Sequence, residues 1–188
     1  MVQKIKRARE LATNAHEGQT RKYSGEPYIV HPEDVHDTLC IWLGRGCEIY
    51  TLTDDQICKM RSAAYHDVKE DCPQITDEQI VEATDADTLS LVCELTNPSK
   101  SSTAPRRIRK QMDRDHLATV SWEAKIIKLI DRTVNLKDMA DCPDKGFLGL
   151  YASESRKLWE ILKDADKILA DQLLKRIEKA EELSNLKD

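Results

Sequence analysis

The chain has 188 residues, a formal net charge of −5 and 40% hydrophobic residues. This size and composition predict one domain with a sizeable core, and the absence of a dominant basic run excludes general nucleic-acid binding. No apolar stretch approaches membrane-spanning length, and the charged N-terminus lacks the apolar segment of a signal peptide, so we expect a cytoplasmic protein with no membrane partner. Six cysteines without a Cys-x-x-Cys pair indicate free thiols rather than a structural zinc site.

Apolar residues at helical spacing and capping residues predict helices along nearly the whole chain, and hence an all-α fold. The predicted helices, in chain order, cover residues about 3–17, 31–43, 54–71, 76–84, 85–95, 106–120, 121–140 and 147–185. The helix that begins at Asp54 is expected to run through His66 and to end before Pro73. Two polar, Gly- and Pro-containing loops interrupt the pattern, over residues 18–30 and 97–105. The second loop has no apolar anchor and is expected to form a mobile lid.

The helix that precedes Pro73 gathers ionisable side chains. At 100° per residue, one side of it carries four such groups: His66, Asp67, Glu70 and Asp71. Together with His31 and Asp131 from two other segments, two imidazoles and two carboxylates can surround one divalent metal, which would offset the cost of burying unpaired charge. The alternative is an accidental His-Asp pair beside solvated charges at a helix end.

The helix over residues 123–140 repeats this pattern. Asp131, Asn135 and Asp138 lie within about 60° of one another on a helical wheel. Apolar residues occupy much of the rest of the wheel. The stripe is too polar for a core position, so we expect a functional wall, with a plain solvated face as the alternative for Asp138.

Three segments resemble the HD hydrolase domain of RelA/SpoT-type alarmone enzymes. They read AHEGQTRKYSGEPYIVHP over residues 15–32, HDVKED over 66–71 and KLIDRTVNL over 128–136. The order of the segments is also that of the family. The resemblance is to the stand-alone small alarmone hydrolases, similar to the metazoan SpoT homologue. It implies one all-α HD-domain helical bundle over residues 1–188, with the metal-site core at about 1–140 and C-terminal helices at about 147–185.

The resemblance implies an enzyme of the stringent response, a 3′-pyrophosphohydrolase that acts on ppGpp- or ppApp-type nucleotides and releases pyrophosphate. It further implies a Mn²⁺ cofactor, although the mixed donor set also suits other divalent metals. The implied metal ligands are His31, His66, Asp67 and Asp131. Glu70 and Asp71 match the family pair that works on the attacking water.

The substrate side is expected to combine basic and polar groups. The resemblance assigns base and phosphate contacts to Arg21 and Lys22 and a nucleotide contact to Asn135. The complete predicted set is Arg21, Lys22, Tyr23, Ser24, Asn135, Asp138 and Lys100. The basic segment over residues 106–110 either contacts substrate or forms a solvated helix face.

The long bifunctional enzymes lack a residue at the position of Tyr23, so an adenine alarmone such as ppApp becomes plausible beside a guanine one. Two other functions remain open. One is another HD nucleotide phosphatase activity, for example on NADPH, and the other is an antitoxin-like role as a non-catalytic partner of an alarmone synthetase. The sequence does not indicate the oligomeric state.

Overall fold

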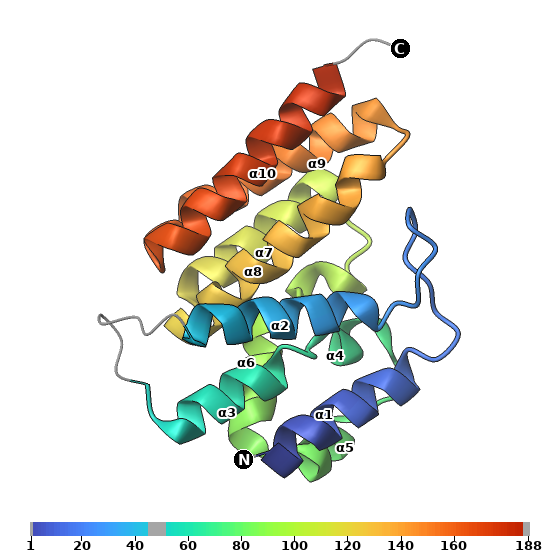
Figure 1. The fold of residues 1–188 in the computed structure, drawn as a ribbon. Helices are drawn as coiled ribbons and strands as arrows, with labels where there is room; N and C mark the ends of the chain where they lie inside the picture. The colour runs from blue at the N-terminus through green and yellow to red at the C-terminus, as the bar shows by residue number, and fades with distance from the viewer. Residues whose placement is uncertain (1, 45–51, 186–188) are drawn as a thin grey trace. The chain divides into compact units, whose positions relative to one another are not determined.

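A computed structural model describes residues 2–44 and 52–185 of the chain. All named secondary-structure elements within these residues are helices (Figure 1). The prediction of an all-α fold is therefore confirmed. The chain divides into two compact units: an N-terminal unit, Met1–Thr20 with Glu26–Asn97, and a C-terminal unit, Arg21–Gly25 with Pro98–Asp188. A single domain over the whole chain stays a prediction. Cys47 lies outside the described residues, and no helix within them is long and apolar enough to cross a membrane.

The N-terminal unit is built from six helices within the described residues: α1 (Val2–Ala15), α2 (Val30–Gly44), α3 (Asp54–Ala63), α4 (Asp67–Asp71), α5 (Asp77–Ala83) and α6 (Ala86–Leu95). Helix α1 packs against α3, α4 and α5, and α3 packs against α2 and α6. Small residues allow this close approach, because Ala8 and Ala12 of α1 are buried against Tyr65, with Ile29 beside them. The start of α2 and the start of α4 are thereby held within one unit.

Side-chain caps fix where these helices begin. Thr76 accepts a hydrogen bond from the amide of Gln79, and the Gln79 side chain accepts one from the amide of Thr76, which makes a capping box. Asp85 likewise accepts a bond from the amide of Thr88 at the start of α6. Both helix starts were predicted from the sequence.

The continuous helix predicted from Asp54 through His66 is wrong. Helix α3 ends at Ala63, and the chain makes a tight turn in which the amides of Tyr65 and His66 donate to carbonyls three residues earlier. Burial of the Tyr65 ring against α1 accompanies this turn. His66 is therefore the N-cap residue of the short helix α4.

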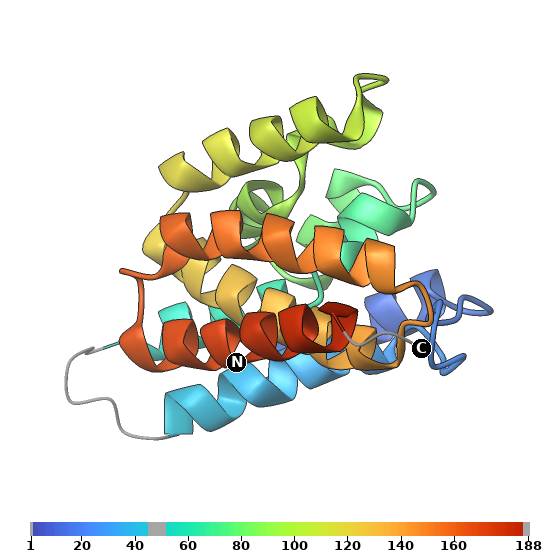
Figure 2. The ribbon, with the colours of Figure 1, turned by 90° about the horizontal axis from the view of Figure 1, so that it is seen from above.

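The C-terminal unit contains η1 (Pro98–Ser101), α7 (Arg106–Thr119), α8 (Trp122–Asp138), η2 (Met139–Asp141), α9 (Lys145–Leu162) and α10 (Lys167–Asn185). Helices α8, α9 and α10 pack against one another, and α7 packs against α9 (Figures 1 and 2). The indole N–H groups of Trp122 and Trp159 donate to carbonyls at Ala165 and Ala170, respectively. Apolar side chains on α8, including Ile126 and Ile130, are fully buried, and they leave the polar stripe of this helix on another face.

The segment expected to be a mobile lid contains ordered structure. Residues 98–101 form the 3₁₀ turn η1, and Ser99 is buried. The Ser99 amide donates to Asp113 of α7 at 3.2 Å, so a polar contact supplies the anchor that the sequence lacked in apolar residues. The carboxylate of Asp113 is also paired with Lys110.

Backbone contacts hold together the two ends of the loop between α1 and α2. An isolated antiparallel bridge joins Thr20 to Pro27, and the amide of Tyr28 donates to the carbonyl of Gln19 at 2.9 Å. Beyond the bridge, Gly25 has a φ of 73°, a left-handed conformation that favours glycine. The base of the loop belongs to the N-terminal unit and its tip, residues 21–25, to the C-terminal unit.

Candidate functional site

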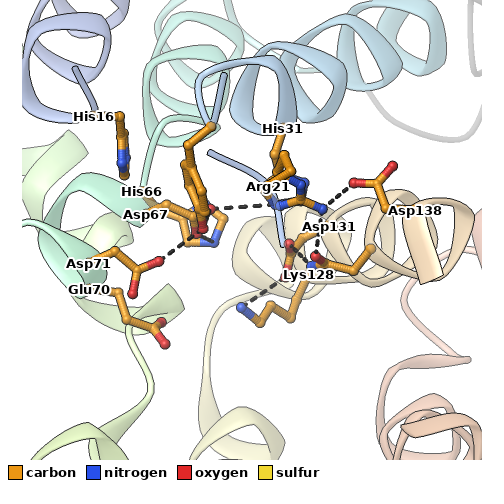
Figure 3. A network of polar contacts seen from close by, with 12 residues as sticks. His16, Arg21, His31, His66, Asp67, Glu70, Asp71, Lys128, Asp131 and Asp138 are labelled. Carbon is orange, nitrogen blue, oxygen red and sulfur yellow. Dashed lines mark hydrogen bonds and ion pairs between the residues drawn. The ribbon is translucent and has the colours of Figure 1, made fainter. Parts of the chain in front are cut away.

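Three of the predicted metal ligands come together within the N-terminal unit. His31 lies in the first turn of α2, His66 precedes α4, and Asp67 is the first residue of α4. All three are buried (Figure 3). His31 Nε2 is 3.4 Å from one carboxylate oxygen of Asp67, and His66 Nε2 is 3.3 Å from the other.

The environment of His66 suits a metal ligand. The residue is 1% exposed, and neither ring nitrogen has a hydrogen-bond partner among the described residues. A buried polar group without a partner costs about 1–3 kcal/mol, and a bound cation removes that cost at a nitrogen that coordinates it. Two imidazoles and a carboxylate are a donor set that divalent transition metals accept. The three side chains lie in mutual contact. Among the described residues, no three His, Cys, Asp or Glu side chains are arranged as they would be around a metal ion.

Tyr28 bridges two carboxylates of α4. Its hydroxyl is 3.0 Å from Asp67 Oδ2 and 2.9 Å from Asp71 Oδ2, which also confirms that residues 67 and 71 share one helix face. A phenol carries one proton and can donate to only one of them at a time. Burial, reinforced by the charges of Asp67 and Asp71, raises the pKa of Tyr28, so the hydroxyl remains protonated. No role for Tyr28 was predicted from the sequence; its place three residues before His31 was the available signal.

A second layer holds Tyr28. The His16 ring stacks on the Tyr28 ring, with centroids 4.5 Å apart. His16 Nδ1 is 2.9 Å from the side-chain oxygen of Gln19 and 3.4 Å from the Cys72 sulfur. Burial raises the pKa of Cys72, so its thiol stays protonated. His16 is thus a structural residue that orients the ring carrying the bridging hydroxyl.

Glu70 points to a different partner. The Asn97 side-chain amide donates to both carboxylate oxygens of Glu70, at 2.8 and 3.0 Å. Asn97 lies just past the end of α6, and its interaction with a residue 27 positions earlier was not predicted. The two acidic residues proposed to work on water therefore have separate polar supports, one amide and one phenol.

In the C-terminal unit, the polar stripe on α8 forms as predicted. The Asn135 side chain donates to Asp131 Oδ1 at 2.7 Å. Arg21, from the loop tip, donates to Asn135 at 3.4 Å and forms an ion pair with Asp138 (Figure 3). The stripe and the predicted substrate-binding arginine are thereby brought together.

Asp131 has a cation of its own. Lys128 Nζ is 3.0 Å from Asp131 Oδ2, and the two side chains are 6% and 5% exposed. Separating a buried pair of this kind costs about 3–5 kcal/mol when one partner is removed. Lys128 was not among the predicted site residues, although its position three residues before Asp131 on one helix was a usable signal.

The remaining predicted substrate residues are more dispersed. The Lys22 ammonium lies 5.1 Å from the centre of the Tyr23 ring and 5.5 Å from that of Phe147. Ser24 is exposed at the loop tip, and Lys100 is exposed in η1. In the basic segment, Arg106 donates two 2.8 Å bonds to Glu154, while Arg107 is exposed and Arg109 is half-buried.

Comparison with known proteins gives concordant results. Residues 8–168 match the family described as HD domain. The guanosine-3′,5′-bis(diphosphate) 3′-pyrophosphohydrolase MESH1 of Xenopus tropicalis is 31% identical over 144 residues, which cover 76% of this chain and 73% of that protein. The corresponding pyrophosphohydrolase of Vibrio cholerae is 35% identical over 152 residues, but these span only 19% of its length.

A solved structure agrees in fold. It was described under the words "A metazoan ortholog of SpoT hydrolyzes ppGpp and plays a role in starvation responses". The two structures match with a TM-score of 0.78 and 25% sequence identity, and the match covers 93% of this chain and 94% of the other.

Proposed function

Because this chain belongs to the HD domain family, we propose that it is a metal-dependent 3′-pyrophosphohydrolase of ppGpp-type nucleotides. The observation that carries the proposal is the buried group of His31, His66 and Asp67, in which the nitrogens of His66 lack hydrogen-bond partners. The match to relatives named for this hydrolysis over about three quarters of the chain supports the choice of substrate class.

The residues that would hold the cation are His31, His66 and Asp67, with Asp131 of α8 as the fourth ligand implied by the family resemblance. We propose Mn²⁺ as the metal, because the set mixes imidazole nitrogen with carboxylate oxygen. When bound, such a cation acidifies water and polarises a phosphoryl oxygen. The place of Asp131 in this set and the identity of the metal are parts of the proposal.

Asp71 and Glu70 are proposed to handle the proton of the attacking water. Asp71 accepts a hydrogen bond from a phenol that cannot ionise at neutral pH, so the carboxylate keeps a fixed orientation with one oxygen not bound by Tyr28. Glu70 is oriented by two hydrogen bonds from the Asn97 amide. Two carboxylates with independent supports can serve distinct steps, one accepting a proton from water and the other returning one to the leaving group.

Arg21 is proposed to bind the substrate phosphates. In the structure its guanidinium is neutralised by Asp138 and contacts Asn135. A pyrophosphate group carries more negative charge than a carboxylate and matches the planar donors of arginine, so it can replace Asp138 as the partner. Lys22, held near the Tyr23 and Phe147 rings, adds a second cation close to a flat apolar surface suited to a purine.

The test is product identification with purified protein loaded with Mn²⁺. With ppGpp and water, we expect GDP and pyrophosphate in equal amounts, and the Asp67→Ala variant serves as the inactive control. Parallel reactions with ppApp and NADPH decide the base preference and the alternative phosphatase activity. If neither ppGpp nor ppApp yields pyrophosphate, with Mn²⁺ or with other divalent metals, the proposal is refuted. The cytoplasmic location stays a prediction.

A further inference from the structure

The N-terminal unit contains a groove that none of the predicted site residues lines. It has a volume of about 390 Å³ and lies between α1, the N-terminal half of α2 and the end of α3, with Tyr65 in its wall. Small-molecule sites in proteins have volumes of about 300–1,000 Å³, so the groove is large enough for a ligand of one or two rings.

The apolar part of the groove is formed by rings and an aliphatic side chain. The His36 and Tyr65 rings stack with their centroids 5.5 Å apart and an interplanar angle of 27°. Ile5 of α1 adds a buried aliphatic surface. A flat ring matches this lining better than a flexible chain, because aromatic and aliphatic walls favour a rigid apolar body.

The hydroxyl of Tyr65 is a hydrogen-bonding group in the wall of the groove. Tyr65 as a whole is 3% exposed and lines the groove. A phenol hydroxyl can donate to an anionic oxygen, so a ligand in the groove can accept a hydrogen bond from Tyr65.

Arg61 supplies a positive charge that no carboxylate of the described residues neutralises at ion-pair distance. Its Nε–H donates to His36 Nε2 at 3.3 Å, which requires that nitrogen to be the acceptor. The proton of His36 is then on Nδ1, which donates to Asp37 at 3.1 Å. Burial lowers the pKa of His36, so the imidazole is neutral and leaves the guanidinium charge uncompensated.

The other charges of the groove do not cancel this excess. Arg9 donates two hydrogen bonds to Glu33, at 2.8 and 2.6 Å. Lys6 is only loosely associated with Glu10, at 3.6 Å, and both side chains are more than half exposed. The lining therefore has three cations, including Arg61, against the two carboxylates of Glu33 and Asp37.

We propose that this groove binds a small aromatic anion, a flat ring with one carboxylate or phosphate group, and that its binding is coupled to the metal site. The anionic group would pair with Arg61 and accept from the Tyr65 hydroxyl, while the ring would pack on Ile5. Coupling is expected because Tyr65 directly precedes His66, and α2 carries both His31 and His36. The coupling rests on the proposed metal site, whereas the binding does not.

Binding is tested by calorimetry on the full chain with two probes, AMP and 4-hydroxybenzoate, which separate a phosphate from a carboxylate source. We expect binding of at least one probe. Tyr65→Phe and Arg61→Gln should each weaken it about tenfold or more, since each removes a hydrogen bond to a charged group. Arg7→Gln, an exposed arginine of α1 outside the groove, should leave it unchanged. Absence of binding by both probes, or binding unaffected by both groove variants, would overturn the proposal.

The coupling is tested by adding Mn²⁺. Linkage requires that a ligand which tightens metal binding is itself bound more tightly with metal present, by the same factor. We expect at least a fivefold decrease of the probe's Kd with Mn²⁺, a typical size for such coupling. The Asp67→Ala variant should keep the probe affinity and lose the Mn²⁺ effect. An equal Kd with and without Mn²⁺ would overturn the coupling, and a protein that binds the probe but hydrolyses no alarmone would instead count against the proposed function.

Discussion

The two units prepare their polar groups in opposite ways. In the N-terminal unit, His66 is buried with both ring nitrogens lacking hydrogen-bond partners. In the C-terminal unit, each acidic residue of the α8 stripe has a cation, Lys128 for Asp131 and Arg21 for Asp138. The nitrogens of His66 can gain a polar partner only when a ligand such as a cation binds. The charges of the α8 stripe are already paired, so a substrate can bind there only by replacing one member of an ion pair.

This difference assigns different tasks to the two units. A buried imidazole that has no hydrogen bond and only a 3.3 Å contact with the Asp67 carboxylate gains free energy from a cation, so metal affinity should depend mainly on the N-terminal unit. An internally paired arginine must give up a carboxylate before it binds phosphate, so the C-terminal unit should control substrate affinity and selectivity. Apart from Asp131, the proposed fourth metal ligand, residues of the two units should therefore affect different measured quantities when they are substituted.

The largest effect is expected at the proposed metal ligands. Asp67→Ala should abolish bound Mn²⁺ and essentially all hydrolysis, because it removes a ligand and leaves two buried imidazoles without their carboxylate. Asp131→Ala should do the same if α8 supplies the fourth ligand. Metal content of the purified variants, measured by elemental analysis, checks both expectations. Full occupancy in either variant would remove that residue from the ligand set.

Glu70→Gln is expected to separate chemistry from metal binding. The amide preserves the shape of the side chain and can still meet Asn97, but it cannot take a proton from water. Turnover should fall about 10²–10⁴-fold while metal content and KM stay near their wild-type values. Steady-state kinetics with ppGpp provide the measurement, and an unchanged kcat would exclude Glu70 from the mechanism.

Tyr28→Phe removes one hydroxyl and keeps the ring that stacks on His16. Asp67 and Asp71 then lose their shared donor, and groups that orient metal ligands typically affect metal affinity or activity about 10–100-fold. We expect weaker Mn²⁺ binding together with lower kcat, and little change in KM. Tyr23→Phe, on the loop tip, is the matched control. Wild-type metal affinity and kcat in Tyr28→Phe would show that the bridge is not needed.

Substitution of Arg21 should change substrate affinity, the property assigned above to the C-terminal unit. Arg21→Ala removes a phosphate partner but no metal ligand, so KM should rise by the equivalent of about 1–3 kcal/mol with metal content unchanged.

Deletion of Tyr23 restores the loop length of the long enzymes and should change the ratio of kcat/KM for ppApp and ppGpp. An unaltered ratio in a folded variant would place base selectivity elsewhere, with Asn135 and Asp138 as the next positions to test.

The features predicted correctly from the sequence are those that depend on residues close together in the chain. Helix starts at Thr76 and Asp85, and the stripe of Asp131, Asn135 and Asp138, follow from caps and from 100° per residue. These features need only residues three to seven apart. The sequence also placed the His-Asp pair and His31 in one site through a motif.

The failures involve contacts that no local pattern encodes. Tyr28 meets α4 across 39 and 43 positions, and Asn97 meets Glu70 across 27. The break between α3 and α4 accompanies the packing of Tyr65 against α1, which local helix propensity does not include. The ordered turn after Asn97 depends on Asp113, a buried carboxylate on a helix that the sequence describes only as charged.

The smallest effect concerns pH, and it too should separate the units. His36 of the N-terminal unit has a lowered pKa because of its burial, whereas the acidic side chains of the α8 stripe in the C-terminal unit are paired with a lysine and an arginine. Above about pH 6.5, His36 is neutral in the folded and unfolded chains and does not affect the pH dependence of stability. Below that pH the unfolded chain takes up the proton first, so stability falls until the lowered pKa of the folded state is reached.

A difference of one pKa unit corresponds to about 1.4 kcal/mol, which sets the scale of the loss. His36→Gln keeps an acceptor for Arg61 but does not titrate, so its unfolding temperature should decrease less than that of the wild type between pH 7 and pH 5. His116→Gln, on α7 of the C-terminal unit, is the control and should retain the wild-type decrease. Thermal unfolding of the metal-free proteins measures this directly. An equal decrease in His36→Gln and wild type would mean that the acid sensitivity of the N-terminal unit does not arise from this imidazole.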